Sequence, residues 1–454
     1  MQYCLAAAAQ AESRYAYDRA VELYQHALQC LNLQEPNPDQ RLHVLLLLIP
    51  AMVRSGDKGS FIGYRREAVA LARQLGDEHL LVRAITCGNA STWQTRTWES
   101  MDADFVAEVT ASLATAHLTD VERCLLDCAH ILEQSVNGDD ETMAQAVHRV
   151  LARARRTGEP DVIALSLYTA SIIFVAEFHA SERRWIRVQL RDVAERHGLS
   201  SYQLYAHFLD FETAAVRGDV QEARRALDAA TALASKLQVT SVSAVLKHYE
   251  GGLAAMTGDY ARAADIYREV SDLLRGPEPG NPRDDILAGG LFSLRLAQGR
   301  LAEIVDLVRG RYETVAREVW VCEYACCLAA AGQDAQARAV LAAGPLTPSL
   351  ARYRLMGWVA CARAAVMLGD EERVAAMYQV LLPFRDQIAG AALGFPFEPV
   401  AHTLGALALS LNDVDHARDH LARALGIATR CGNSLWIDLI NADLARCGTQ
   451  TASA

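Results

Sequence analysis

Lysine is nearly absent from this chain, and the phosphate-binding motifs that use it are missing. Lys58, Lys236 and Lys247 are the three lysines among 454 residues, and none follows a glycine-rich phosphate loop. The sequence contains neither a GxxxxGK[ST] loop nor a GxGxxG segment after a strand. It also lacks the GxSxG signature of a nucleophile. We therefore predict no cofactor.

Long hydrophobic runs and an excess of positive charge are missing as well. The longest apolar run, residues 42–53, is interrupted by His43 and Pro50 and is shorter than the roughly 20 residues that cross a bilayer. The N-terminus lacks the basic and apolar regions of a signal peptide. A formal net charge of −11 disfavours general affinity for nucleic acid or anionic membranes. We expect a cytoplasmic protein without direct nucleic-acid or membrane contact.

The sequence also lacks a disulfide framework and a metal-binding motif. Eleven cysteines, an odd number scattered along the chain, are typical of reduced core thiols. Cys322 and Cys326 are four residues apart, as are His416 and His420, but no CxxC or HExxH sequence accompanies either pair. We therefore predict no metal site and expect both histidines to face solvent.

What the chain does have is a turn of small residues that recurs from end to end. Such periodicity is the signature of a solenoid of helix pairs, each of which buries its apolar face against its neighbours. The clear copies are Gly56-Asp57, Gly138-Asp139, Gly218-Asp219, Gly258-Asp259, Gly299-Arg300, Gly332-Gln333, Gly369-Asp370 and Asn412-Asp413. Degenerate copies at Arg14-Tyr15-Ala16, Thr97-Trp98-Glu99-Ser100 and His179-Ala180-Ser181 complete the series. The predicted fold is all-α, a right-handed α-α superhelix of about eleven helix pairs.

Small residues at fixed distances from these turns resemble the tetratricopeptide pattern. That pattern has a small residue seven positions before the turn glycine and an alanine five positions after it. Gly251, Gly405, Ala325 and Ala362 occupy the first position, and Ala223, Ala263, Ala337 and Ala417 the second. Small side chains at both places let the two helices of a pair approach closely. No alternating pattern of the kind found in strands is present, so we predict no β-sheet.

The array is predicted to span residues 1–454 as a single domain, without an ATPase domain or a helix-turn-helix. Proline-rich connections at 275–283 and 387–396 are predicted to be irregular loops between repeats. The first is a candidate seam between two halves.

Candidate binding residues lie on the first helices of the pairs, because these helices line the concave groove of a tetratricopeptide superhelix. Aromatic and charged groove residues suit the capture of a peptide or small molecule. The alternative is that the same residues simply pack inside an over-wound superhelix. The candidates are Tyr205, Phe208, Glu212, His248, Cys322, Arg363 and His402, with Trp93, Arg96 and Glu177 beside degenerate turns.

Two long segments of the C-terminal part resemble a known family. Residues 352–384, RYRLMGWVACARAAVMLGDEERVAAMYQVLLPF, and residues 400–448 are similar to the helical-repeat region of large actinobacterial ATP-dependent transcriptional regulators of the LuxR, SARP or AAA type. Residues 66–85 are similar to early repeats of that region. In that family the repeats receive an inducer or a partner protein, and other domains bind DNA. The resemblance implies either a free-standing repeat protein or part of a split or truncated regulator.

Three functional hypotheses follow. The first is a non-enzymatic repeat protein that binds a protein partner or small effector in its groove, in transcriptional regulation. The second is an enzyme of specialised metabolism that uses Glu177, Glu212, His248 or His402 as a general acid or base. The third is a structural assembly subunit, and the sequence leaves the oligomeric state open.

Overall fold

The structure is a computed structural model, and almost every residue that it describes is in a helix or a turn. It describes residues 1–33, 35, 37–55, 61–89, 103–115, 117–135, 140–237, 242–274, 282–314, 317–344 and 351–451. The predicted turns at Gly56-Asp57, Thr97-Trp98-Glu99-Ser100 and Gly138-Asp139 lie outside these residues, as do residues 275–281 of the candidate seam.

The described residues form eleven successive helix pairs and one further helix. The pairs are α1 (Gln2–Ser13) with α2 (Tyr17–Asn32), α3 (Pro38–Ser55) with α4 (Phe61–Leu75), α5 (Glu78–Thr86) with α6 (Ala103–Leu113), α7 (Asp120–Gln134) with α8 (Asp140–Thr157), α9 (Pro160–Ile173) with α10 (Ala180–Arg196), α11 (Ser200–Val216) with α12 (Val220–Lys236), α13 (Ser243–Met256) with α14 (Tyr260–Leu273), α15 (Pro282–Gln298) with α16 (Val305–Thr314), α17 (Arg317–Ala330) with α18 (Asp334–Ala343), α19 (Ala351–Leu368) with α20 (Glu371–Leu381), and α21 (Val400–Ser410) with α22 (Val414–Cys431), followed by α23 (Ser434–Thr451). Short 3₁₀ helices include η2 (Leu301–Ile304), η3 (Leu382–Phe384) and η4 (Ala391–Leu393). Each helix packs on the next along the chain, which confirms the predicted all-α solenoid.

The recurring dipeptide makes the turn inside described pairs such as α11–α12. Gly218 ends α11 with φ of 69°, a left-handed conformation that costs glycine little. The Asp219 amide then donates to the Ala214 carbonyl at 3.0 Å, while the Asp219 carboxylate accepts from the Glu222 amide at 3.0 Å and caps α12. One residue thus closes the first helix and the next starts the second, so two adjacent residues suffice to specify the turn.

The small residues around the turns allow close packing within a pair. A Cβ placed on Gly405 would lie 2.6 Å from the Leu421 side chain, and one on Gly251 would lie 3.0 Å from Ile266. Ala263 and Ala417, on the partner helices, are fully buried. The predicted spacing therefore has the packing role that the sequence indicated.

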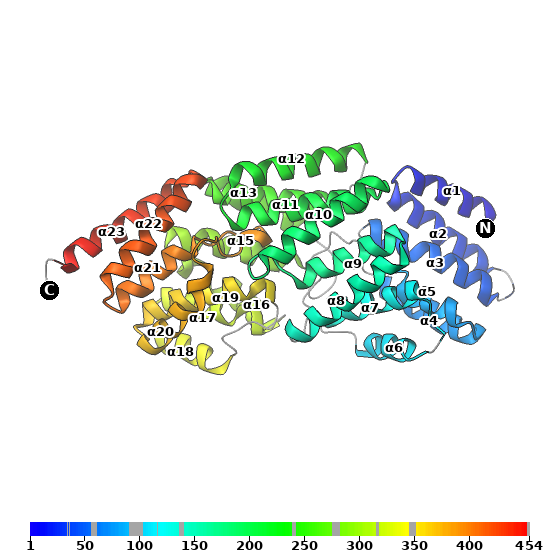
Figure 1. Ribbon diagram of the computed structural model, residues 1–454, viewed down its shortest axis with the longest axis horizontal. Helices are drawn as coiled ribbons and strands as arrows, with labels where there is room; N and C mark the ends of the chain where they lie inside the picture. Colours follow the sequence, from blue (N-terminus) through cyan, green and yellow to red (C-terminus); the bar gives the residue numbers. More distant parts are fainter. Residues whose placement is uncertain are drawn as a thin grey trace.

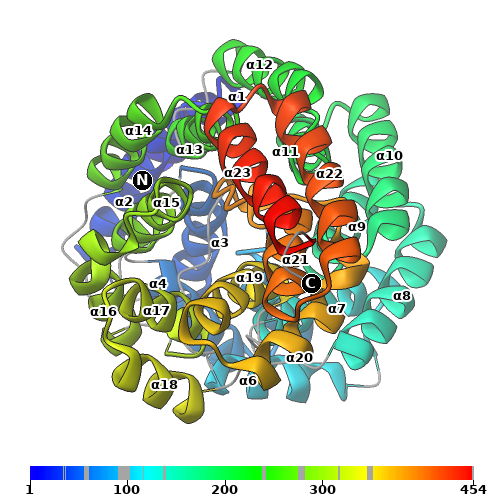
Figure 2. The ribbon, with the colours of Figure 1, turned by 90° about the vertical axis from the view of Figure 1, so that its left-hand side faces the viewer.

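The pairs wind into a superhelix with its termini at opposite ends (Figure 1). Seen end-on, second helices such as α8, α10, α12 and α14 form the outer layer, and first helices such as α11, α13, α19 and α21 lie inside (Figure 2). Side chains join elements roughly ten helices apart, so successive superhelical turns are in contact. The Tyr15 hydroxyl lies 3.3 Å from the Ser200 hydroxyl, and Arg354 donates to Asp140 at 3.1 Å.

Asn433, between α22 and α23, makes the most complete of these connections. Its side chain is fully buried, and Nδ2 donates to the carbonyls of Ala255 and Met256, each at 3.2 Å. These carbonyls lie in the last turn of α13. The C-terminal end of the array is thereby fastened to the α13–α14 turn.

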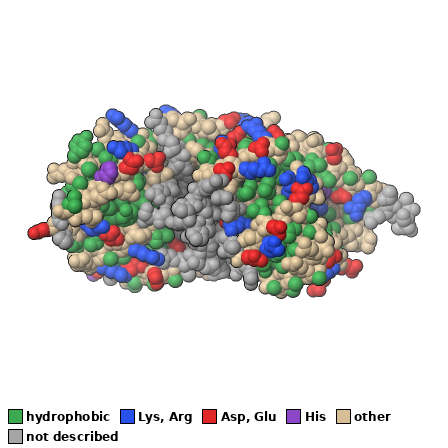
Figure 3. Space-filling view, turned by 180° about the vertical axis from the view of Figure 1, so that it is seen from behind, with side chains coloured by type: hydrophobic (Ala, Val, Ile, Leu, Met, Phe, Trp, Pro, Cys, Tyr) green, Lys and Arg blue, Asp and Glu red, His purple; other side chains and the backbone are tan. Residues whose placement is uncertain are grey.

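The outer surface carries charges of both signs. Figure 3 shows Lys or Arg and Asp or Glu side chains interspersed over the described part of one face. In the described part of the chain, none of the helices combines the length and the apolar character needed to cross a membrane.

Candidate functional site

The interior of the superhelix is occupied by the chain itself. Residues 387–399, here called the inner strap, connect α20 and η3 to α21 and run past the inner helices. The Ile388 amide donates to the Val216 carbonyl of α11 at 2.8 Å, and the Tyr267 hydroxyl of α14 donates to the Gly394 carbonyl at 2.7 Å. Ile388 also forms an isolated antiparallel bridge with Pro399, the one β-type pairing among the described residues. The connection predicted as an irregular loop is thus part of the core.

Glycines make room for the inner strap. A Cβ on Gly252 of α13 would lie 2.9 Å from the backbone of Gly394, and one on Gly289 of α15 would lie 3.1 Å from the Phe395 ring. Gly394 itself has φ of 74°. Phe397 is fully buried, with its ring centroid 4.8 Å from that of Phe292. Contacts this close indicate a permanently packed segment, since releasing it would expose several fully buried side chains.

His248 holds the middle of the strap. Its Nε2–H donates to the Leu393 carbonyl at 2.6 Å, and its ring lies 4.7 Å from that of Phe395. Nδ1 is buried without a partner. Burial lowers the pKa of His248 to about 4, so the ring is neutral at pH 7. A residue predicted to face an open groove instead binds the backbone of the same chain.

Arg363 and His402 meet at a buried carboxylate at the end of the strap. Arg363 Nε donates to Glu398 Oε1 at 2.5 Å, and His402 Nδ1 lies 2.8 Å from Glu398 Oε2. His402 Nε2 lies 3.2 Å from Asp443 of α23, and the Thr403 hydroxyl donates to Glu398 at 2.7 Å. The cluster ties α19, α21 and α23 to the strap.

Charge decides the protonation of this cluster. Burial alone would raise the pKa of Glu398, but Arg363 and His402 outweigh it and hold the pKa far below its ordinary value. Burial and Arg363 both act to lower the pKa of His402, yet Glu398 and Asp443 together raise it. The groups therefore stay ionised and paired, as in a structural ion network.

A second polar cluster joins the α9–α10 connection to α11 and α13. Arg183 donates to Glu212 and to the carbonyls of Ser171 and Phe174, while the Tyr249 hydroxyl donates to the other oxygen of Glu212 at 3.0 Å. The Glu212 side chain keeps 16% of its surface accessible.

The remaining candidates within the described residues, Tyr205, Phe208, Cys322 and Glu177, are also buried in the interior. Tyr205 is buried, with its hydroxyl 3.0 Å from that of Ser171. Phe208 packs with its ring 5.4 Å from that of Tyr249, and Cys322 is buried in the core. Trp93 and Arg96 lie outside the described residues.

Sequence reasoning missed Arg183, Glu398 and Asp443, which complete these two clusters. One signal was present for Glu398, because it is the only charged residue between residues 387 and 401. A single charge in so apolar a segment needs a partner if the segment is buried. The sequence does not identify that partner.

The expectation for the two histidines of α22 is correct for one and wrong for the other. His416 is exposed and lies 2.8 Å from Asp413. His420 is buried, and its Nε2 lies 3.0 Å from the Tyr378 hydroxyl of α20, because the neighbouring pair covers this side of the helix. Among the residues described, no group of three His, Cys, Asp or Glu side chains is arranged to hold a metal ion.

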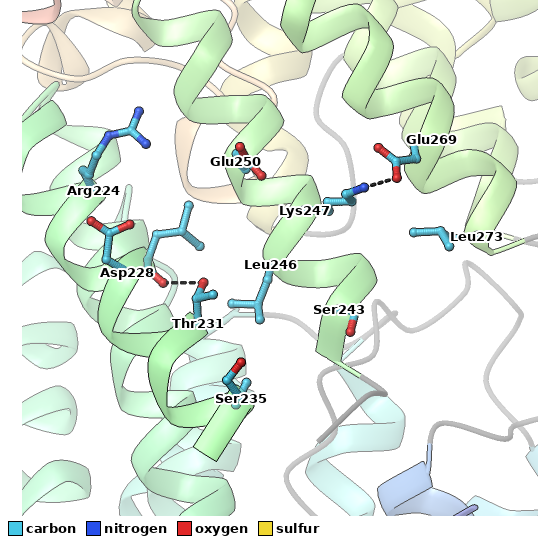
Figure 4. A pocket seen from close by; sticks show the side chains of 12 residues that line it. Arg224, Asp228, Thr231, Ser235, Ser243, Leu246, Lys247, Glu250, Glu269 and Leu273 are labelled. Atoms are coloured by element: carbon cyan, nitrogen blue, oxygen red, sulfur yellow. Dashed lines mark hydrogen bonds and ion pairs between the residues drawn. The ribbon is translucent and has the colours of Figure 1, made fainter. Parts of the chain in front are cut away.

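An open hollow lies on the outer side, between α12, α13 and α14 (Figure 4). Its volume is about 660 Å³. Leu227, Leu246 and Leu273 supply apolar surface, and Leu273 is 57% exposed. Charged side chains surround them, including a Lys247–Glu269 ion pair.

Comparison with known proteins yields likenesses among solved structures. No family model matches this chain, and no curated protein matches it. Among solved structures the chain is similar to a circular tandem repeat protein with novel repeat topology and enhanced subunit contact surfaces. The identity is 15% over 96% of this chain and 91% of that chain, with a TM-score of 0.15. At this level the likeness carries nothing about function, and the solenoid assignment rests on the helices and their stacking.

Proposed function

We propose that this chain is a non-enzymatic, cytoplasmic helical-repeat protein that receives a protein partner or a small effector as the receiving arm of a bacterial transcriptional regulator. The regulatory context comes from the resemblance of residues 352–384 and 400–448 to the repeat region of ATP-dependent regulators. In this proposal the ATPase and DNA-binding functions belong to the partner.

The hollow between α12, α13 and α14 is the observation that carries the partner-binding role. Its volume is in the range of pockets that bind ligands, and an apolar floor with a charged rim suits an amphipathic helix of the partner. The helices α12 and α14 flank the hollow, so a partner helix lying between them would contact Leu227, Leu246 and Leu273. Its polar face would meet Arg224 and Asp228 on one side and Lys247 and Glu269 on the other.

The arrangement of acids and bases favours this proposal over the enzyme hypothesis. His248 is committed to a backbone carbonyl, His402 to two carboxylates, and Glu212 to Arg183 and Tyr249. A general acid or base needs a proton that it can exchange with a substrate within hydrogen-bond reach. Hydrogen-bonding atoms of all three side chains are instead occupied by partners within the protein.

Site-specific photo-crosslinking tests the partner-binding role. A photoreactive amino acid at Ser235, on the exposed rim of the hollow, should trap a protein with an ATPase or DNA-binding domain. The same group at Ala152, an exposed position of α8, is the matched control. Leu246→Arg should abolish the adduct, whereas Leu33→Arg, directly after α2 at a position 89% exposed, should have no effect. Equal trapping at residues 152 and 235 would contradict the proposal.

A further inference from the structure

The side of the hollow formed by α13 and α14 carries charges that are already paired. Lys247 of α13 forms an ion pair with Glu269 of α14 (Figure 4). Arg262 of α14 forms another with Glu250 of α13. Because these four charges neutralise one another in pairs, this side contributes little selectivity for a charged partner.

The opposite wall of the hollow, α12, carries two charges that are not paired. Arg224 and Asp228 line the hollow, and both are exposed. They are four residues apart, yet Figure 4 shows no ion pair at either side chain, and neither forms one with another described residue. Their order agrees with this, because an i, i+4 pair with the basic residue first is the less favourable one. The α12 wall therefore presents a positive and a negative group, in a fixed order, to whatever fills the hollow.

The two ends of the hollow also differ in chemistry. Figure 4 places Arg224 and Glu250 at one end and the exposed Ser235 and Ser243 at the other, so α12 and α13 run in opposite directions. A cation such as Arg224 favours the C-terminus of a neighbouring helix, and serine hydroxyls accept the unpaired N–H groups of a helix N-terminus. A partner helix therefore fits with its N-terminus at the serines and its C-terminus at Arg224, antiparallel to α12.

We propose that the partner enters the hollow as a helix antiparallel to α12, with a basic residue followed four positions later by an acidic residue on the side that faces α12. The basic residue pairs with Asp228 and the acidic residue with Arg224, while apolar residues between them and α14 contact Leu246 and Leu273. From Arg224 to Ser235 the wall is roughly 16 Å long, which suits a helix of about three turns. The inference rests on the partner-binding role proposed above and adds the direction and the charge order of the partner helix.

Selection from a displayed peptide library on the full-length chain tests this proposal. The library consists of helical peptides of about 14 residues with a fixed leucine stripe, in which two positions beside the stripe, four residues apart, vary among Lys, Glu and Ala. Selection on wild type should enrich peptides with Lys first over peptides with Glu first by at least about fivefold, and Leu246→Arg should abolish the enrichment. Helix formation by itself would favour the opposite order, because Glu before Lys is the better intrahelical pair.

Exchanging the two charges of α12 shows whether they select the order. The double variant Arg224→Asp, Asp228→Arg keeps the net charge and should reverse the order that is enriched. The matched exchange Asp265→Arg, Arg268→Asp, on exposed positions of α14 outside the hollow, should leave it unchanged. The proposal is wrong if wild type enriches neither order, both orders equally or the Glu-first order, or if the exchange on α12 has no effect.

Crosslinking at Ser235 separates this inference from the function on which it rests. A partner protein trapped at Ser235, without a charge order among the selected peptides, would overturn the inference and leave the partner-binding role standing. The expected charge order, without a protein trapped at Ser235, would support a helix-binding hollow and count against the receiving arm of a regulator.

Discussion

Replacing Glu177 by glutamine should stabilise the protein at high pH and leave its stability nearly unchanged at low pH. Burial raises the pKa of this carboxyl to about 7 from an ordinary value of 4.5, against weaker opposing effects of its own amide, Arg183 and Arg352. Glutamine has nearly the same shape and never ionises. The difference between wild type and variant therefore isolates the cost of the buried charge.

The direction of this effect follows from the protonation of Glu177 in the folded and in the unfolded chain. Below pH 4.5 the carboxyl is protonated in both the folded and the unfolded chain, so its ionisation contributes nothing to stability. Between pH 4.5 and 7 the unfolded chain loses the proton while the folded chain keeps it, and the free energy of unfolding falls as pH rises. The full cost above pH 7 is about 3 kcal/mol, from 1.4 kcal/mol for each tenfold change in the proton equilibrium.

Urea denaturation of wild type and Glu177→Gln at pH 5 and pH 8 measures this effect. The variant should unfold at higher urea concentration than wild type at pH 8, by up to about 3 kcal/mol in the free energy of unfolding, and by much less at pH 5. Glu141→Gln, at an exposed position of α8, is the control substitution. A Glu177→Gln effect of the same size at both pH values, or a loss of stability at pH 8, would refute the reasoning.

Four further predictions concern the segments that hold the superhelix together. The pH dependence expected of His248 is opposite to that of Glu177, because its pKa in the folded chain, about 4, lies below the ordinary 6.5. The free energy of unfolding of wild type should therefore fall by up to about 3 kcal/mol as pH falls from 6.5 to 4, and that of His248→Gln should fall by less in the same urea titrations. Gly252→Ala should lower the free energy of unfolding by about 2 kcal/mol, because its Cβ would meet the backbone of the strap. The control Gly63→Ala, where no atom lies near the new Cβ, should raise the free energy of unfolding by about 0.5–1 kcal/mol. Equal effects of the two substitutions would refute the tight fit of the strap. Arg363→Met should cost about 3–5 kcal/mol by leaving Glu398 buried without its guanidinium, and Arg225→Met, at a side chain 72% exposed, should cost little in chemical denaturation. Asn433→Ala should lower the free energy of unfolding by about 2 kcal/mol and increase amide hydrogen exchange at the end of α13. Unchanged exchange there would contradict the role of Asn433 in holding the C-terminal helices against α13.

The helix pairs could be predicted because their signals are local. A residue that tolerates positive φ, followed by a side chain that caps a helix, acts within a few positions of the chain, and the small residues report on the partner helix only one turn away. Asn412 could therefore be predicted to take the place of the turn glycine, and its φ is 60°.

The inner strap could not be placed in the same way. Residues 387–396 contain Gly390, Gly394 and Pro396, which are ordinary loop signals. Their apolar, nearly uncharged character was compatible with burial, but burial depends on α11, α13 and α14, which lie more than a hundred residues earlier in the sequence. The same is true of His420, whose exposure is decided by Tyr378 on the neighbouring pair.

The sequence by itself thus determined the all-α class, the positions of the turns and the approximate number of helix pairs, because each depends on short-range hydrogen bonding and packing. Tertiary structure alone decided that the concave interior is filled by residues 387–399 and that Arg363 and His402 share Glu398. It also decided that Glu177 is buried. These arrangements depend on the pitch of the superhelix, which is fixed by many weak contacts between distant repeats.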